Sequence, residues 1–250
     1  MEYTLKIRTN KGPAFVKWSN VDDLARYANL QSGFYLQSDQ SFSRELLLDN
    51  FEFWNQMFWD QRQNQGMLDY SDGSKILDIG AGMSVIDLLL YNYVPNSKFY
   101  LLDNEELNSD FAKLGPRKIC YSEQYPYYNS WAPVKDAISA SNFDPNRFLF
   151  LSSIDQIKEQ MDVVTSYLSW GFHYPKDVYW TPVFDILKTG GKLVLDIRPL
   201  HDRDIIGEIT EAMKSEPTKF SFPKVPTYVD NFDGPNKDVV GYRCMWIKNV

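Results

Sequence analysis

The stretch that decides the fold is K-I-L-D-I-G-A-G-M-S-V-I-D-L-L-L, which runs from Lys75 to Leu90. Its opening apolar run predicts a short buried strand. Gly80 and Gly82 follow at once and predict a tight turn that comes close to a ligand, because a Cβ would collide there. A second apolar run, beginning at Val85, predicts a helix. The stretch therefore predicts a strand, a glycine turn and a helix, in the order in which a doubly wound α/β sheet begins.

Strand and helix patterns alternate along the rest of the chain, which predicts a mostly parallel sheet covered on both faces. The turn signal D-G-P-N at Asp233 lies between the last two β-rich stretches, so the final strand is expected to run antiparallel. We thus expect a doubly wound, seven-stranded α/β sheet. The predicted strands are Lys75–Ile79, Ser97–Asp103, Arg147–Ser152, Met161–Ser166 and Lys192–Ile197, with two more in Lys219–Val229 and Val239–Lys248, and the predicted helices are Val85–Tyr93, Val178–Leu187 and Asp202–Lys214.

The first seventy residues follow a different pattern. Val21–Leu30 and Ser41–Gln65 predict helices, and the second carries Phe51, Trp54 and Phe58 on one face. Aromatic residues at this spacing are typical of core packing. The functional alternative is that these helices cover a substrate cleft. We expect residues 1–70 to form an N-terminal helical cap and residues 71–250 to form a Rossmann-like core.

Composition excludes several classes of protein. The 250 residues carry a formal charge of −7, which opposes a nucleic-acid partner, because phosphate binding needs an excess of lysine and arginine. Cys120 and Cys244 are far apart, and His173 and His201 are the only histidines, so no metal site is expected. The N-terminus lacks the apolar stretch of a signal peptide, and no apolar run is long enough to span a membrane. We expect a soluble, cytoplasmic protein.

Two acids accompany the glycine turn. Asp78 stands two residues before Gly80, and Asp103 ends the second predicted strand. A carboxylate at the end of that strand accepts two hydrogen bonds from a ribose diol, which supports nucleoside binding. A dinucleotide fingerprint would want Gly or Ala where this chain has Val85, so the pyrophosphate cradle is incomplete. The order Asp-x-Gly-x-Gly at a strand end resembles the first motif of class I S-adenosylmethionine-dependent methyltransferases.

The resemblance implies a site for S-adenosylmethionine. It places the glycine backbone against the methionine part of the cofactor and puts Asp78 near the cofactor's amino group. It also implies that Asp103 binds the ribose and that the adenine lies at the end of the third predicted strand. The implied cofactor-binding residues are Asp78, Gly80, Ala81, Gly82, Asp103, Asn104, Ser153, Ile154, Asp155 and Ser166.

Several of these residues have a plainer alternative role. Ser153 or Asp155 is also suited to cap a following helix, which is compatible with adenine recognition. Asn104 either flanks the adenine edge or is a turn residue. Ser84 stands where many members of the family have a third glycine. A serine is tolerated at that position if its φ is negative.

The fourth predicted strand leads into T-S-Y-L-S-W-G-F-H-Y-P, from Thr165 to Pro175. The segment lacks the Asp-Pro-Pro-Tyr or Asn-Pro-Pro-Tyr signature of amino methylation. It resembles stretches of little-characterised small methyltransferases of phage and marine bacterial type, some of which are regarded as sugar methyltransferases. His173 is the candidate general base, because imidazole titrates near neutral pH. The alternatives are a structural histidine and a methyl transfer that depends on alignment alone.

Four residues are candidates for the acceptor pocket. The aromatic residues among them either shape that pocket or pack in the core. Arg198, just past the fifth predicted strand, either holds a carboxylate or phosphate or pairs with a neighbouring aspartate. The candidate substrate-binding residues are Trp170, Tyr174, Tyr128 and Arg198.

These observations predict an S-adenosylmethionine-dependent methyltransferase that acts on a small-molecule acceptor, a sugar-like hydroxyl. Two alternatives stay open at this point. One is an NAD-dependent oxidoreductase, since NAD-binding folds use the same acid at the second strand. The other is a catalytically inactive, methyltransferase-like protein that binds a nucleoside. The sequence does not determine the oligomeric state.

Overall fold

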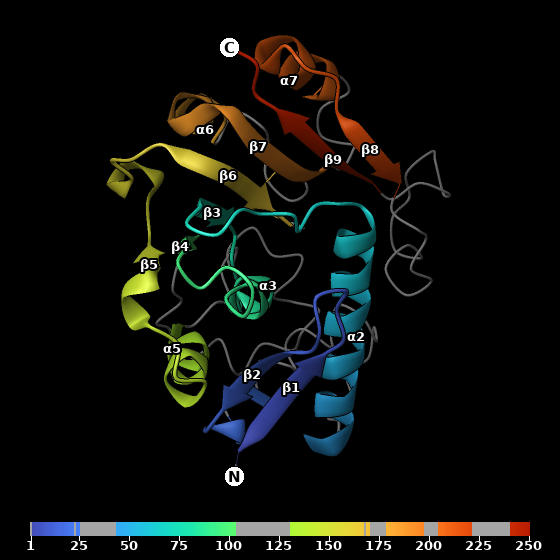
Figure 1. Ribbon diagram of the computed structural model, residues 1–250, viewed down its shortest axis with the longest axis vertical. Helices are drawn as coiled ribbons and strands as arrows, with labels where there is room; N and C mark the ends of the chain where they lie inside the picture. Colours follow the sequence, from blue (N-terminus) through green and yellow to red (C-terminus); the bar gives the residue numbers. More distant parts are fainter. Residues whose placement is uncertain are drawn as a thin grey trace, which may run out of the picture. The chain divides into compact units, whose positions relative to one another are not determined.

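The computed structural model describes residues 2–22, 24–25, 44–103, 131–167, 169–170, 179–197, 205–221 and 241–250 (Figure 1). The chain divides into two compact units. Unit 1 comprises Met1–Asp69, Gly82–Pro95 and Asn104–Asn146, and unit 2 comprises Tyr70–Ala81, Asn96–Asp103 and Arg147–Val250. None of the helices in the described ranges is both long and apolar enough to cross a membrane.

Unit 2 is built on a seven-stranded sheet whose order is β5-β4-β3-β6-β7-β9-β8. Neighbouring strands from β5 to β7 are parallel, whereas β9 runs antiparallel to both β7 and β8. The predicted doubly wound sheet with an antiparallel last strand is therefore confirmed. Its strands are β3 (Lys75–Ile79), β4 (Lys98–Leu102), β5 (Phe148–Leu151), β6 (Met161–Ser166), β7 (Leu187–Ile197), β8 (Thr218–Ser221) and β9 (Tyr242–Ile247).

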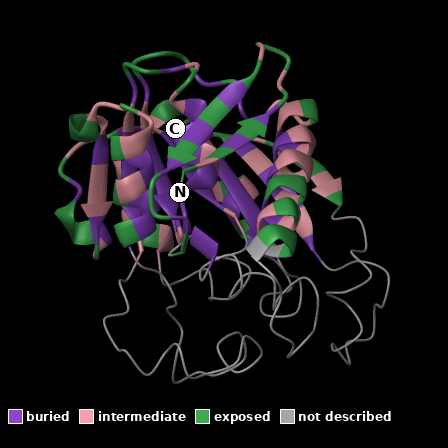
Figure 2. Ribbon diagram, turned by 90° about the horizontal axis from the view of Figure 1, so that it is seen from below, coloured by how far each residue is buried: buried purple, intermediate pink, exposed green. Residues whose placement is uncertain are grey.

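The central strands are buried on both faces, as Figure 2 shows by the purple of the strands inside the fold. In both β3 and β4, four of the five residues are buried. Such strands read as continuous apolar runs, which is why their positions were predictable. The helices described in this unit after β6 are α6 (Trp180–Ile186) and α7 (Ile205–Met213).

The predicted start of the fifth strand at Lys192 was wrong, because β7 begins at Leu187. Leu187 pairs with Met161, and the ladder then shifts register between Met161 and Val163. The shift lets the strand pass through Gly190, whose φ is 80°. A glycine inside a strand is typical of such an irregularity, but in the sequence it looks like a strand boundary.

Unit 1 contains a β-hairpin that the predicted all-helical cap lacks. Strands β1 (Tyr3–Ile7) and β2 (Ala14–Trp18) are antiparallel, and buried and exposed residues alternate along both. Each strand has only five residues, so its period-two pattern is short and easily missed. The helices whose bounds lie within the described residues of unit 1 are α2 (Arg44–Asn64), α3 (Val85–Leu90) and α5 (Trp131–Ala140).

Side-chain amides satisfy backbone groups on the outer edges of this hairpin. Gln56 of α2 accepts from the N–H of Arg8 at 2.8 Å and donates to its carbonyl at 3.0 Å. Asn92 makes the same pair of bonds with the backbone of Phe15, at 3.4 and 3.2 Å. These bonds occupy edge groups that otherwise remain open to pairing with another strand.

Candidate functional site

The strand order of unit 2 reverses beside β3. The chain runs from β3 outward to β4 and β5, and then returns to β6 on the other side of β3. In doubly wound sheets, ligands bind at such a reversal, beyond the carboxyl ends of the strands. The ends of β3 and β6 are therefore the candidate functional site.

Asp78 lies at this reversal on β3, where it is buried next to β6. Thr165 is its partner in the strand ladder, and the Thr165 hydroxyl donates to Asp78 Oδ1 at 3.0 Å. Thr165 is itself buried. A carboxylate that accepts a hydrogen bond from a fixed hydroxyl has a defined orientation. Thr165 carries no signal in the sequence, because only the strand order brings it beside Asp78.

The turn after β3 has the backbone that its glycines allow. Gly80 has φ 74° and Gly82 has φ 53°, both in the left-handed region. The N–H of Gly80 and that of Ala81 both donate to the carbonyl of Leu102, at 2.8 and 3.3 Å. A Cβ on Gly80 would lie only 2.0 Å from Ser169 Oγ. The sequence predicted that a Cβ at this position would collide with a bound ligand. In the structure of the protein alone, the atom that such a Cβ would meet belongs to Ser169.

Ser84 does not meet the condition of a negative φ. Ser84 has φ 50° and precedes α3, but its side chain makes no capping hydrogen bond. The other non-glycine residues with positive φ in the described ranges, Asn142 and Lys214, follow α5 and α7, where the left-handed conformation is common. The Ser84 hydroxyl is buried and has no hydrogen-bond partner in the described structure. Ser84 is therefore a strained position beside the glycine turn.

Asp103 lies directly after β4. Its N–H donates to the carbonyl of Leu151 at 3.1 Å, and the residue is half-buried. Because β3 and β4 are parallel neighbours, Asp103 lies at the same edge of the sheet as Asp78. The predicted ribose role of Asp103 is compatible with this position.

The end of β5 forms a short 3₁₀ turn, Ile154–Gln156, where a helix was one alternative. Ser153 accepts from the N–H of Asp155 at 3.2 Å, and Gln156 accepts from the N–H of Ser153 at 3.1 Å. This is a capping box, so Ser153 has the capping role that the sequence suggested. Ile154 packs in the core and Asp155 is exposed. Adenine recognition by these residues stays a prediction.

Ser166 and Trp170 are both completely buried, at 0% exposure. The Ser166 hydroxyl donates to the carbonyl of Ile79 at 2.8 Å and accepts from the N–H of Trp170 at 2.9 Å. Its single hydrogen is therefore used within the fold. The Trp170 ring meets Tyr179 edge-on, with 6.0 Å between ring centroids. The structure thus gives Ser166 a holding role and Trp170 a packing role, and their predicted contacts with cofactor and acceptor stay predictions.

The other predicted site residues fall outside the described residues, so their roles stay predictions. They are Asn104, Tyr128, His173, Tyr174 and Arg198.

A buried ion pair between β7 and β9 also lies at this edge of the sheet. Arg243 Nε and Nη2 donate to the two Asp196 oxygens at 2.6 and 2.8 Å, and the side chains are only 2% and 0% exposed. Burial pushes the pKa of Arg243 down, but the Asp196 carboxylate outweighs it and holds the pKa above its usual value. The guanidinium also lies 5.3 Å from the ring centroid of Tyr167, just past β6. The sequence contained no signal for this pair, because strand register creates it.

Neither a metal centre nor a reactive thiol lies among the described residues. They contain no group of three or more histidine, cysteine, aspartate or glutamate residues suited to hold a metal ion. Cys244 is buried, and burial raises the pKa of its thiol to about 12. A thiol with that pKa is protonated at neutral pH and is a poor nucleophile.

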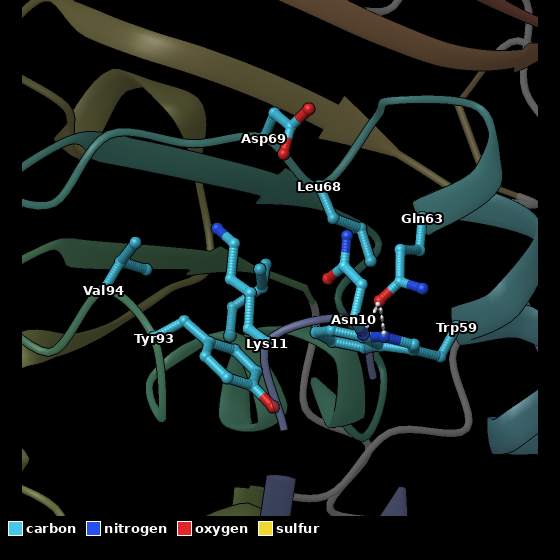
Figure 3. Close-up of a pocket in the computed structure, with 9 residues that line it drawn as sticks. Asn10, Lys11, Trp59, Gln63, Leu68, Asp69, Tyr93 and Val94 are labelled. Carbon is cyan, nitrogen blue, oxygen red and sulfur yellow. Dashed lines mark hydrogen bonds between the residues drawn. The ribbon is translucent and has the colours of Figure 1, made fainter. Parts of the chain in front are cut away.

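Unit 1 contains a hollow beside α2 (Figure 3). Gln63 accepts from Trp59 Nε1 at 3.0 Å and from the N–H of Asn10 at 2.9 Å, and Lys11 and Tyr93 stand across from them. Its interior offers about 20 Å³ to water-sized molecules, which is room for one or two waters. The hollow is therefore too small to hold a nucleoside-sized ligand.

Comparison with known proteins gave likenesses in structure only. No protein-family model matches the sequence, and no curated protein matches it. A precorrin-6y C5,15-methyltransferase from Geobacter metallireducens GS-15 is 16% identical over 76% of this chain and 88% of its own, with a TM-score of 0.44. An rRNA methylase from Streptococcus thermophilus is 12% identical over 72% of this chain and 90% of its own, with a TM-score of 0.44.

A methyltransferase from Pyrococcus furiosus is 15% identical over 76% of this chain and 83% of its own, with a TM-score of 0.45. Likenesses at this level carry no argument about activity. The assignment of a Rossmann-like methyltransferase fold rests on the strand order of unit 2, with the antiparallel β9 between β7 and β8.

Proposed function

We propose that this chain is an S-adenosylmethionine-dependent methyltransferase. The observation that carries the proposal is the carboxylate-and-glycine turn at the point where the sheet's strand order reverses. Asp78, held by Thr165, precedes a turn at Gly80 that only glycine adopts easily, and Asp103 ends the neighbouring strand. This combination matches the cofactor motif that the sequence resembles.

The residues of the site suit a cofactor with a positive charge and a ribose. Asp78 would receive the amino group of the methionine part, and Asp103 would accept from the ribose hydroxyls. S-adenosylmethionine supplies an electrophilic methyl group, so the protein's main task is to align the acceptor with it. His173, three residues after the anchored Trp170, would take the acceptor's proton.

The proposed acceptor is a small, sugar-like molecule with a hydroxyl group. The formal charge of −7 supports a small molecule over a nucleic acid, although one structure of similar fold is named an rRNA methylase. Tyr128, Tyr174 and Arg198 are proposed to contact the acceptor. We also propose that the protein works in the cytoplasm.

Calorimetry tests the cofactor assignment. S-adenosylhomocysteine and S-adenosylmethionine should bind, and NAD should not. Asp103→Ala should weaken S-adenosylhomocysteine binding by roughly tenfold or more, because a charge-assisted hydrogen bond contributes about 1.5–3 kcal/mol. Glu211→Gln, which removes an exposed charge on α7, is the matched control and should leave the affinity unchanged. Binding of NAD alone would favour an oxidoreductase and defeat the proposal.

Transfer of a labelled methyl group to a panel of sugars, nucleotides and RNA tests the acceptor class. Label should appear on a sugar hydroxyl. His173→Gln should lower turnover about 10²–10⁴-fold while sparing cofactor affinity. Cofactor binding without transfer to any acceptor would point to an inactive nucleoside-binding protein.

A further inference from the structure

Two hydroxyl side chains join the end of β6 to the end of β3. Thr165 Oγ1 donates to Asp78 Oδ1 at 3.0 Å, and Ser166 Oγ donates to the carbonyl of Ile79 at 2.8 Å. All four residues are buried. The ends of these two strands are therefore held together by side chains as well as by the strand ladder.

A third hydroxyl residue continues this contact onto the glycine turn. Ser169 lies against Gly80 so closely that a Cβ there would be 2.0 Å from Ser169 Oγ and 2.3 Å from Ser169 Cβ. Real Cβ atoms do not approach other heavy atoms to such distances, so the Ser169 side chain fills one face of Gly80. Anything placed on that face has to move Ser169.

Ser169 has little room to move by itself, because its neighbour Trp170 is fixed. The N–H of Trp170 donates to Ser166 Oγ at 2.9 Å, and its indole is completely buried against Tyr179. A displacement of the Ser169 side chain thus weakens the hydrogen bond from the Trp170 N–H to Ser166 Oγ. The strength of that hydrogen bond therefore indicates the state of the contact between Ser169 and Gly80.

We propose that Ser169 couples occupancy of the Gly80 turn to the Trp170 anchor beyond β6. A ligand that approaches the filled face of Gly80 displaces the Ser169 side chain and strains the Trp170 anchor. The identity of that ligand as an S-adenosyl compound rests on the proposed function, but the coupling itself does not. Because such coupling is reciprocal, the state of the Trp170 anchor also alters ligand affinity at the turn.

Hydrogen exchange of the Trp170 amide tests the coupling without any ligand. Gly80→Ala puts a methyl group on the face that Ser169 fills, so the Trp170 amide should exchange about tenfold faster or more, since overpacking weakens the local structure by at least that factor. Gly73→Ala is the matched control. Gly73 has φ 86° in the same unit, but nothing lies within 4 Å of its added Cβ, so the Trp170 exchange rate should not change.

The double variant Gly80→Ala/Ser169→Gly should return the Trp170 exchange rate to within about threefold of the wild-type rate, since the crowded side chain is gone. Exchange of the Tyr100 amide in β4 reports global opening. A faster Trp170 amide with an equal rise at Tyr100, or no difference between Gly80→Ala and Gly73→Ala, would overturn the proposal. If Gly80→Ala does not fold, Ser169→Thr crowds the same contact from the other side and should speed Trp170 exchange without affecting Tyr100.

A second hydrogen-exchange experiment adds S-adenosylhomocysteine. Its binding should change Trp170 exchange in the wild-type protein and leave it unchanged in Ser169→Gly, with the exposed-turn variant Ser71→Gly as control. A wild-type protein that does not bind the compound contradicts the proposed function, and the Gly80→Ala comparison then still decides the coupling. An equal ligand response in wild type and Ser169→Gly contradicts the coupling alone.

Discussion

Replacing Arg243 with methionine tests the energetics of the buried ion pair. The variant leaves the Asp196 carboxylate, which is 0% exposed, without the guanidinium that donates two hydrogen bonds to it. Removing one partner of a buried pair costs about 3–5 kcal/mol, because the remaining charge stays desolvated. For a chain of this size each kcal/mol lowers the melting temperature by about 2–4 °C. We therefore expect the melting temperature of Arg243→Met to fall by about 10 °C, and circular dichroism measures it.

Two comparison variants separate this mechanism from a general loss of an ion pair. Lys188→Met breaks the Lys188–Asp162 pair, whose side chains are 38% and 33% exposed, and should cost about 1 kcal/mol or less. Asp196→Leu/Arg243→Met replaces both buried charges by apolar groups and should recover most of the lost stability. The reasoning fails if Arg243→Met costs no more than Lys188→Met, or if the double variant is less stable than either single variant.

Three smaller predictions concern local features. Ser84→Gly should raise the free energy of unfolding by about 0.5 kcal/mol, because relief of the strained φ of 50° outweighs the added entropy of the unfolded chain. Ser84→Ala keeps the strain and should not stabilise the protein, and thermal melts of the two variants test the difference. Gln56→Ala should cost about 1 kcal/mol and speed exchange of the Arg8 amide, and no effect on that amide would contradict the edge role. Hydrogen bonds from Lys75 and Tyr100 lower the pKa of Glu159 to about 2, so its stabilisation is present above pH 4.5 and lost as pH falls toward 2. Urea midpoints of wild type and Glu159→Gln should therefore differ more at pH 6 than at pH 2.5.

Local sequence signals were sufficient to predict most of the strands in the sheet of unit 2, although not the start of β7. The predicted bounds of β3 and β6 match the structure, because each carries apolar residues that are buried on both faces and is closed by a polar or glycine residue. The left-handed backbone at Gly80 was likewise readable, since a glycine directly after a strand predicts a tight turn. The hairpin of unit 1 was missed, because two five-residue strands carry too few alternations to stand out.

The contacts of the candidate site, by contrast, depend on tertiary structure. Ser166 and Ile79 are separated by 87 residues, and Arg243 and Asp196 by 47. No periodicity links residues so far apart, and strand order and register alone bring them together. The same holds for Ser169, which looks like an ordinary loop serine in the sequence but fills one face of Gly80. A sequence pattern records what each residue does to its own stretch of backbone, whereas the chemistry of a site depends on which strand ends become neighbours when the sheet forms.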